Sequence, residues 1–164
     1  MRTLLTALTT LVLLVACGGG SMSGSNTNPA PQSVATSGTI TAFGSVFVNG
    51  VRYDVSAAKL MKNGRTVTQA GLAVGEVATV RGQQDLQSGQ GSADSVEVED
   101  NVVGPIGNID VPGAQITALG QTINITATTS FGKGITPADL TGLKTGDAIE
   151  VSGLADASGA IMAT

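Results

Sequence analysis

Histidine and tryptophan are absent from this sequence of 164 residues, and cysteine occurs once. Without histidine, the chain has no imidazole metal ligand, no Ser-His-acid triad and no general base of the most common kind. The four lysines lie in polar, turn-like stretches, which disfavours a Ser–Lys dyad because such a dyad needs a buried lysine. These absences lead us to expect a protein that is not an enzyme and has no cofactor.

Basic and aromatic residues are also scarce. The chain has eight Lys and Arg against twelve Asp and Glu, with one tyrosine and three phenylalanines. Nucleic-acid binding depends on basic side chains that neutralise phosphates and on aromatic rings that stack on bases. We therefore expect no nucleic-acid partner.

The longest apolar run lies at the N-terminus, from Leu4 to Val15, and follows Met1-Arg2. A transmembrane helix needs about 20 apolar residues, so this run of twelve is too short to span a bilayer comfortably. A basic start followed by a short apolar run is typical of a secretory signal peptide. We assign residues 1–16 to the signal.

The single cysteine, Cys17, ends the sequence Leu14-Val15-Ala16-Cys17. This sequence resembles the lipobox of bacterial lipoproteins. The resemblance implies that the Cys17 thiol receives a diacylglyceryl group, that the bond before it is cut, and that its new amine is acylated. Several acyl chains give stable membrane anchoring where one chain does not. We therefore predict lipidation at Cys17 and a location in the bacterial cell envelope.

Residues 17–37 have the composition of a flexible tether, rich in Gly and Ser, without charge and almost without bulky apolar residues. Such a segment cannot bury enough surface to offset its ordering entropy. Gly18, directly after the cysteine, is not the aspartate that retains enteric lipoproteins in the inner membrane. This difference favours the outer membrane and leaves open which side the protein faces.

The rest of the chain contains one sequence unit that occurs twice. Residues 46–55 align with 116–125 at an offset of 70, and residues 72–82 align with 143–153 at an offset of 71. Gly89 and Ala93 also match Gly159 and Ala163, again at an offset of 70. Three separated blocks at nearly one offset predict two domains, 38–101 and 102–164. The second copy is expected to be incomplete, because Thr164 aligns with Asp94 and the counterparts of the following strand residues are missing.

Each copy carries β signals. Asn49-Gly50 predicts a two-residue hairpin, because both turn positions need positive φ, and Asn63-Gly64 predicts a second, looser turn of this kind. Alternation after Gly75 and the cost of burying Glu150 place Ala78, Val80, Ile149 and Val151 in the cores. Tyr53 aligns with Ile123 and is also predicted to be buried.

About five strands in about 65 residues, with a short helical turn before the fourth at 136–140 in copy two, predict an all-β fold. We expect two tandem, small, five-stranded barrels of the OB type. The Leu-x-x-Gly-[Asp/Glu] element in each copy also resembles tandem repeats of bacterial envelope lipoproteins that are classed as a domain of unknown function. That resemblance implies no activity and no catalytic residue.

Two pairs of side chains are candidate sites. Glu97 and Glu99 share one strand face about 7 Å apart, a spacing that could suit a cation or a glycosidase pair, although a solvated strand face gives the same pattern. Phe47 aligns with Thr117 and therefore points to a surface, where it could bind a ligand together with Arg52. We expect no catalytic residue and no metal site, with Glu97 and Glu99 as the weak exception.

These features predict a lipid-anchored envelope protein that binds or spaces other components without catalysis. Its partners would be the membrane, through the lipid, and an envelope protein or glycan. The alternative is a saccharide-binding or hydrolytic envelope protein that uses carboxylates on strand faces.

Overall fold

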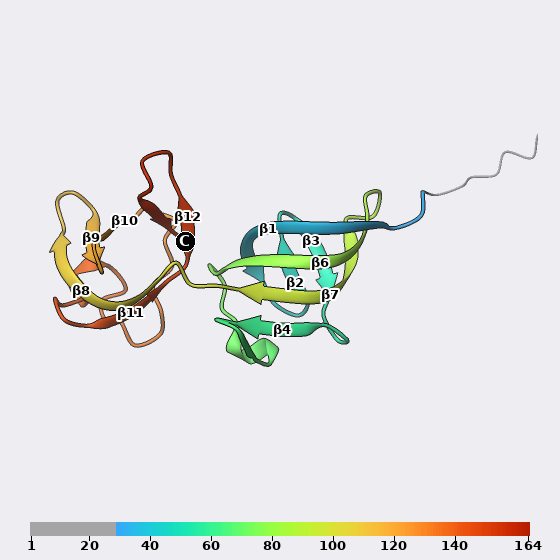
Figure 1. The fold of residues 1–164 in the computed structure, drawn as a ribbon, viewed down its shortest axis with the longest axis horizontal. Coiled ribbons are helices and arrows are strands. Elements are labelled where there is room, and N and C mark those ends of the chain that lie inside the picture. Colours follow the sequence, from blue (N-terminus) through green and yellow to red (C-terminus); the bar gives the residue numbers. More distant parts are fainter. Residues whose placement is uncertain (1–28) are drawn as a thin grey trace, which may run out of the picture.

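The computed structural model describes residues 29–164, which form two β-sheet units, one after the other along the chain (Figure 1). The predicted signal, Cys17 and most of the predicted tether lie outside the described residues. Within residues 29–164, no helix is both long and apolar enough to cross a bilayer.

The first unit is a closed five-stranded barrel with a hairpin attached. Its sheet has the order β3-β2-β1-β6-β7-β4-β5, and a further parallel pairing of β3 with β7 closes the ring. The ring order, with its parallel contact between the third and fifth ring strands, is that of the predicted OB-type barrel. The strands are β1 (Gln32–Ala42), β2 (Val46–Val48), β3 (Val51–Asp54), β4 (Lys59–Lys62), β5 (Arg65–Thr66), β6 (Val77–Asp85) and β7 (Gln90–Val98).

Two hairpins of the first unit follow directly from the sequence. Asn49 and Gly50, between β2 and β3, have φ values of 52° and 78°. Asn63 and Gly64, between β4 and β5, have φ values of 50° and 73°. Asparagine and glycine adopt this left-handed backbone more readily than other residues do, so both predicted turns are confirmed.

The core of the first barrel contains the residues that alternation predicted. Tyr53, Ala78 and Val80 are fully buried, and so are Val96 and Val98 of β7. The Tyr53 hydroxyl donates a hydrogen bond to Gln84 Oε1 at 3.2 Å. The aromatic ring therefore fills the core while its polar group keeps a partner.

The first strand begins earlier than we expected. Residues 32–37, assigned to the tether from their composition, form the first half of β1 and pair with β6 from Gln32↔Gln84 to Ser37↔Thr79. Small polar residues are poor strand formers alone, but the long edge of β6 gives their backbone a partner. The predicted boundary at residue 38 therefore falls inside a strand.

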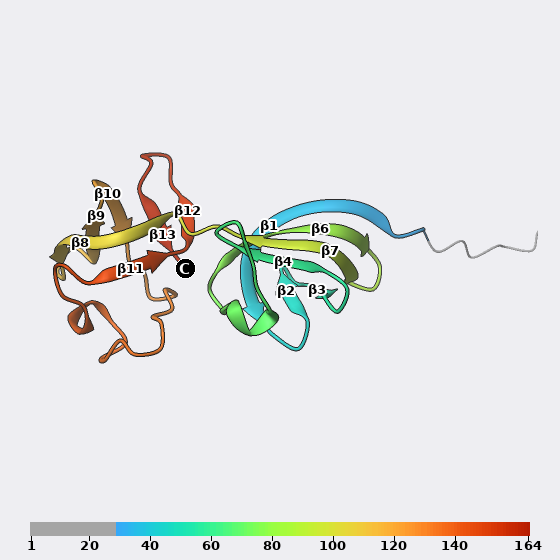
Figure 2. The ribbon, with the colours of Figure 1, turned by 60° about the horizontal axis from the view of Figure 1, so that its bottom comes forward.

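The second unit is a half-barrel built on the same plan. Its sheet has the order β11-β8-β9-β10-β13-β12, with β10 and β13 paired in parallel as β3 and β7 are. Its strands curl as Figure 2 shows, and its buried side chains form a hydrophobic core of their own. The strands are β8 (Val102–Asp110), β9 (Gln115–Ala118), β10 (Gln121–Asn124), β11 (Ala148–Val151), β12 (Gly153–Ala155) and β13 (Ile161–Ala163).

The two edge strands of the half-barrel are consecutive in the chain. β11 pairs with β8, and β12 pairs with β13, with only Ser152 between them. In the first unit, the single strand β6 makes both corresponding pairings, with a register shift against β7 between Arg81 and Gly82. Among the predicted core residues of this unit, Val151 is buried, whereas Ile149 is half-buried against the core.

The helical segments are single 3₁₀ turns, η1 (Gln69–Gly71) and η2 (Leu140–Gly142). The turn that we predicted over residues 136–140 begins at Leu140 instead. Its cap is Asp139, whose carboxylate accepts hydrogen bonds from the Thr141 N–H at 2.7 Å and from the Thr141 hydroxyl at 2.6 Å. A carboxylate is a strong cap, and it places the start of the turn at the last residue of the predicted segment.

Candidate functional site

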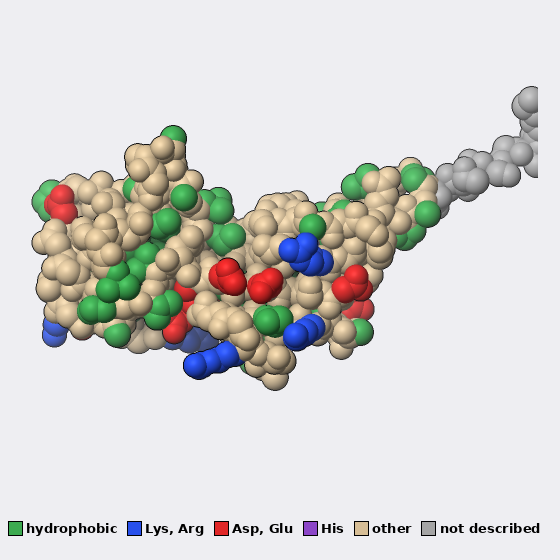
Figure 3. Space-filling model, in the orientation of Figure 1, with side chains coloured by type: hydrophobic (Ala, Val, Ile, Leu, Met, Phe, Trp, Pro, Cys, Tyr) green, Lys and Arg blue, Asp and Glu red, His purple; other side chains and the backbone are tan. Residues whose placement is uncertain are grey.

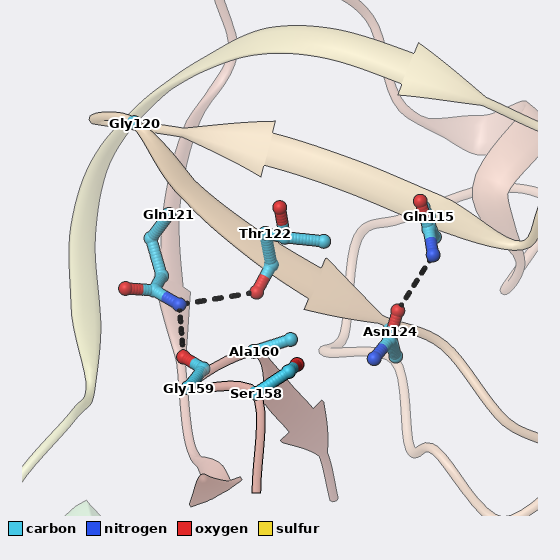
Figure 4. Close-up of a pocket in the computed structure, with 8 residues that line it drawn as sticks. All are labelled: Gln115, Gly120, Gln121, Thr122, Asn124, Ser158, Gly159 and Ala160. Carbon is cyan, nitrogen blue, oxygen red and sulfur yellow. Dashed lines mark hydrogen bonds between the residues drawn. The ribbon is translucent and has the colours of Figure 1, made fainter. Parts of the chain in front are cut away.

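A polar groove of about 400 Å³ lies on the second unit, between the β9–β10 hairpin and the turn that joins β12 to β13 (Figure 4). We call it the amide groove, because amide side chains dominate its lining. Its lining has no charged side chain and no aromatic ring. The lining residues are Gln115, Gly120, Gln121, Thr122, Asn124, Ser158, Gly159 and Ala160.

Strand alternation directs these side chains outward. Ile123 in the middle of β10 is fully buried, so Thr122 and Asn124 on either side of it point to the opposite face. The turn opposite is shaped by Asp156, whose carboxylate accepts hydrogen bonds from the Ser158 hydroxyl at 2.6 Å and the Ser158 N–H at 2.8 Å. These bonds hold the pKa of Asp156 below its usual value.

Hydrogen bonds inside the groove fix the orientation of two amides. Gln121 Nε2 donates to the Gly159 carbonyl at 2.6 Å, and Gln115 Nε2 donates to Asn124 Oδ1 at 3.0 Å (Figure 4). Both glutamines use their nitrogen in this way, so their Oε1 atoms remain as acceptors for a ligand. The groove therefore offers oriented, uncharged acceptors.

The corresponding face of the first unit carries the predicted pair Phe47 and Arg52. The structure brings them together as direct partners across β2 and β3, with Phe47 half-buried and Arg52 exposed. Arg52 aligns with Thr122 of the amide groove. Asp54, the next outward residue, has a lowered pKa, mainly because its carboxylate accepts the Ser56 N–H and hydroxyl and, to a smaller extent, because Arg52 is near. The two equivalent faces thus differ in charge.

Glu97 and Glu99 line a second groove, of about 410 Å³, between the two units. Ser37, Thr79 and Asn101 also line it, together with residues of β12. Figure 3 shows acidic side chains gathered at this junction. No group of three or more potential Asp, Glu, Cys or His metal ligands occurs within residues 29–164.

Lys62 occupies the centre of a cluster of carboxylates at the junction. Its Nζ lies 2.7 Å from Glu76 Oε1, 3.2 Å from Glu150 Oε2 and 3.7 Å from Asp100 Oδ2. Burial alone would lower the pKa of Lys62, but hydrogen bonds to Glu76 and Glu150 outweigh it and raise the pKa above its usual value. One cation thereby links the first unit to the second.

Sequence reasoning found Phe47 and Arg52 but missed the amide groove. Its amides attract no attention individually, because Gln and Asn are ordinary surface residues. The available signal was the alignment of the two copies, in which Thr122 and Asn124 stand opposite Arg52 and Asp54. A comparison of the two copies would have shown that the same face carries charged residues in the first copy and uncharged polar residues in the second.

Comparison with known proteins agrees with this duplication. Neither a curated protein nor a solved structure matches the chain. A family model described as a domain of unknown function, DUF5666, matches twice, over residues 37–97 and 103–164, which together make up most of the chain. The chain therefore belongs to the DUF5666 family of domains of unknown function and carries two copies of that domain in tandem.

Proposed function

We propose that this protein is a lipid-anchored, non-enzymatic binding protein of the bacterial cell envelope, and that its amide groove holds an uncharged glycan. The anchoring part of the proposal rests on the Leu14–Cys17 sequence, with the outer membrane favoured by Gly18. The binding part rests on the structure of the second repeat.

The glycan proposal rests on one observation, which is that amide side chains around one groove are held in fixed orientations. Sugars present rows of hydroxyl groups, each a donor and an acceptor, and amide and hydroxyl side chains pair with them without a net charge. The groove lies against the second and third strands of the half-barrel and the turn before its last strand. OB-type barrels bind oligosaccharides and oligonucleotides on this face. The uncharged lining of this groove favours a sugar over a phosphate-bearing strand.

Glu97 and Glu99 support a second candidate, in which the groove between the repeats acts on saccharides. Glu97 lies on β7 and Glu99 directly follows its last residue, Val98, so that side-chain alternation would place both carboxylates on one face, about 7 Å apart. Glycoside hydrolysis needs two carboxyl groups that flank the scissile bond from opposite sides. Two side chains on one face of a single extended segment do not flank a sugar in this way. Their arrangement favours saccharide binding over hydrolysis.

The anchoring proposal is tested by metabolic labelling with palmitate in a bacterial host. The wild-type chain should incorporate the label and sediment with membranes, and Cys17→Ser should lose both properties, because only a thiol forms the thioether. Separation of the two membranes then tests the preference for the outer membrane. A Cys17→Ser chain that sediments with membranes as the wild type does would contradict the proposal.

The glycan proposal is tested by calorimetric titration of the full-length protein with oligomers of β-1,4-linked N-acetylglucosamine, an uncharged polar probe. Gln121→Ala should weaken binding about fivefold, the equivalent of about 1 kcal/mol for one hydrogen bond. The matched control is Gln87→Ala. Gln87 lies in the β6–β7 turn of the first repeat and aligns with residue 157, and its substitution should not change the affinity. Equal affinity of both variants and the wild type would exclude the amide groove. Release of reducing ends that Glu97→Gln abolishes would instead favour the hydrolytic alternative.

A further inference from the structure

Four side chains form one row across the sheet of the second repeat. Gln115 of β9 pairs with Asn124 of β10, which pairs in turn with Met162 of β13. Met162 also pairs with Leu154 of β12. Directly paired residues direct their side chains to the same face of a sheet. We call these four residues the outer row.

The outer row lies on the face opposite the core. Ile161 and Ala163, on either side of Met162, are buried, so the Met162 side chain points outward. Its Sδ accepts a hydrogen bond from Asn124 Nδ2 at 3.4 Å, which shows that these two members of the row are in contact. Leu154 is 53% exposed. The row therefore passes from two polar amides to two apolar side chains that solvent can reach.

The outer row joins the two grooves described above. Gln115 and Asn124 line the amide groove, whereas Leu154 lines the groove between the repeats. Met162 lies between Asn124 and Leu154. Neighbouring strands are about 4.8 Å apart, so the row spans about 14 Å. A ligand that leaves one groove can thus follow adjacent side chains into the other.

The corresponding row of the first repeat has a different chemistry. Three polar residues pair there across the sheet, at the positions that align with the last three members of the outer row: Asp54, Ser92 and Gln83. Gln83 also pairs with Ser33 of β1, and its Nε2 donates to Ser33 Oγ at 2.8 Å. A paired strand therefore lies where the outer row of the second repeat reaches a groove.

The apolar pair Met162 and Leu154 suits the faces of sugar rings. A pyranose ring directs its hydroxyl groups around its rim and presents C–H groups on its faces. The hydroxyl groups need polar partners such as the amides. The C–H faces gain free energy when they leave water for an apolar surface. A glycan that extends from the amide groove along the outer row would meet both kinds of contact in turn.

The groove at the far end of the row adds negative charge. Glu97 and Glu99 line it, and neither is in an ion pair within residues 29–164. Asn101 also lines it, and its Oδ1 accepts the Gly153 N–H at 2.8 Å, which leaves its Nδ2 as a donor. A protonated amine on the glycan complements this lining, because it donates hydrogen bonds and carries the opposite charge.

We propose that the two grooves and the outer row form one extended site for a linear amino-sugar chain. Acetylated rings occupy the amide groove, further rings cross Met162 and Leu154, and a ring with a free amine lies beside Glu97 and Glu99. This inference rests on the proposed function, because the chain begins in the amide groove. It adds the length of the ligand, its path and the position of its charge.

The length of the site is tested by calorimetric titration of the full-length protein with a disaccharide and a hexasaccharide of β-1,4-linked N-acetylglucosamine. The hexasaccharide should bind about tenfold more tightly, because its far rings reach the outer row as part of a molecule that is already bound. Leu154→Ala should weaken binding of the hexasaccharide about threefold and leave the disaccharide unaffected. Leu86→Ala is the matched control, since Leu86 is 64% exposed in the β6–β7 turn and lines neither groove.

The charged end is tested with a partly deacetylated hexasaccharide, at a pH where its amines are protonated. It should bind the wild type about threefold more tightly than the fully acetylated chain does. The double variant Glu97→Gln, Glu99→Gln should lose this preference. Asp94→Asn should keep it, because Asp94 is an exposed acid of β7 that lines neither groove. The comparison is between two ligands on one variant, so a change in overall stability does not affect it.

Three results would overturn the proposal, and they can be distinguished. Equal affinity for the disaccharide and the hexasaccharide, with both weakened in Gln121→Ala, would confine the site to the amide groove and leave the proposed function intact. A preference for free amines that survives in the double variant would remove Glu97 and Glu99 from the site. Absence of binding to every oligomer would refute the glycan proposal itself, and this inference with it.

Discussion

The side chain of Leu119 covers Gly104 in the second repeat, so that a Cβ at Gly104 would lie 2.8 Å from Leu119 Cδ1. The same relationship holds in the first repeat, where a Cβ at Gly38 would overlap the side chain of Asn49. Asn49 and Leu119 are equivalent hairpin residues, and both have left-handed backbones. Each turn thus folds its first side chain back over a glycine of the neighbouring strand.

Leu119→Asn is expected to stabilise the protein by about 1 kcal/mol, because leucine is strained at a φ of 51° and asparagine is not. Little burial is lost, since Leu119 is 68% exposed. The gain should raise the melting temperature, measured by circular dichroism, by about 4 °C. The reverse change, Asn49→Leu, should destabilise, because Asn49 Nδ2 donates to the Ser37 carbonyl at 2.9 Å. A lower melting temperature for Leu119→Asn would contradict this account.

Gly82→Ala is expected to destabilise by about 2–3 kcal/mol, because its Cβ would overlap the Ser92 carbonyl oxygen, which belongs to a paired strand and cannot move aside. The matched control is Gly107→Ala, whose Cβ would meet only the Thr117 carbonyl oxygen at an ordinary 3.4 Å. Urea denaturation should show a clear loss for the first variant and less than about 1 kcal/mol for the second. Equal losses would mean that the space around Gly82 is not limiting.

Lys62→Met should destabilise far more than Glu150→Gln. Glu76 is only 8% exposed and keeps a single N–H partner, Ala73, when the lysine is removed. A buried carboxylate that has lost its cation makes the expected loss about 3 kcal/mol. The Glu150 side chain is 58% exposed, so its ion pair contributes less than about 1 kcal/mol. Urea midpoints measure both. Similar losses would show that burial does not separate the two pairs.

Stability should form a plateau between about pH 5 and pH 10. Hydrogen bonds within their own turns lower the pKa values of Asp85, Asp139 and Asp156, so their contribution is complete above about pH 4 and is lost as the pH falls through the lowered values. The raised pKa of Lys62 gives a contribution that is complete below about pH 10 and is lost above it.

The acid side of this profile can be assigned with one substitution. Asp156→Asn removes a titrating group, so the difference between its urea midpoint and that of the wild type should shrink between pH 6 and pH 3. Gln87→Ala, which removes no titrating group, serves as the control, and its difference from the wild type should stay constant over this range. A constant difference for Asp156→Asn would show that the turn around Asp156 does not contribute to acid sensitivity.

Local chemistry made much of the fold predictable. The Asn-Gly pairs required left-handed turns, and the alignment of the two copies identified Ala78, Val80 and Val151 as core residues. The start of β1 at Gln32 was not predictable, because residues 32–37 form a strand only through their pairing with β6. Pairing between distant segments leaves no signal in the composition of either one.

The candidate site was less predictable than the fold, for a related reason. Phe47 and Arg52 stand out as individual residues, and the structure confirms that they are neighbours. Gln115, Gln121 and Asn124 acquire meaning only together, after a hairpin and a distant turn have been brought to one groove. A site made of ordinary polar residues is recognised by its geometry and not by its residue types.

Ser152, which interrupts the strand between β11 and β12, also joins the two repeats. Its Oγ accepts a hydrogen bond from the Val77 N–H at 2.7 Å, and its carbonyl accepts the Thr164 N–H at 3.0 Å. The first bond links it to the other repeat, and the second holds the end of its own unit. In tandem arrays, cooperativity depends on the interface between neighbours. Because Ser152 serves both roles, the contact between the repeats depends on the folding of the second unit. A force applied to either end of the described chain would therefore act on the hydrogen bonds of the same serine.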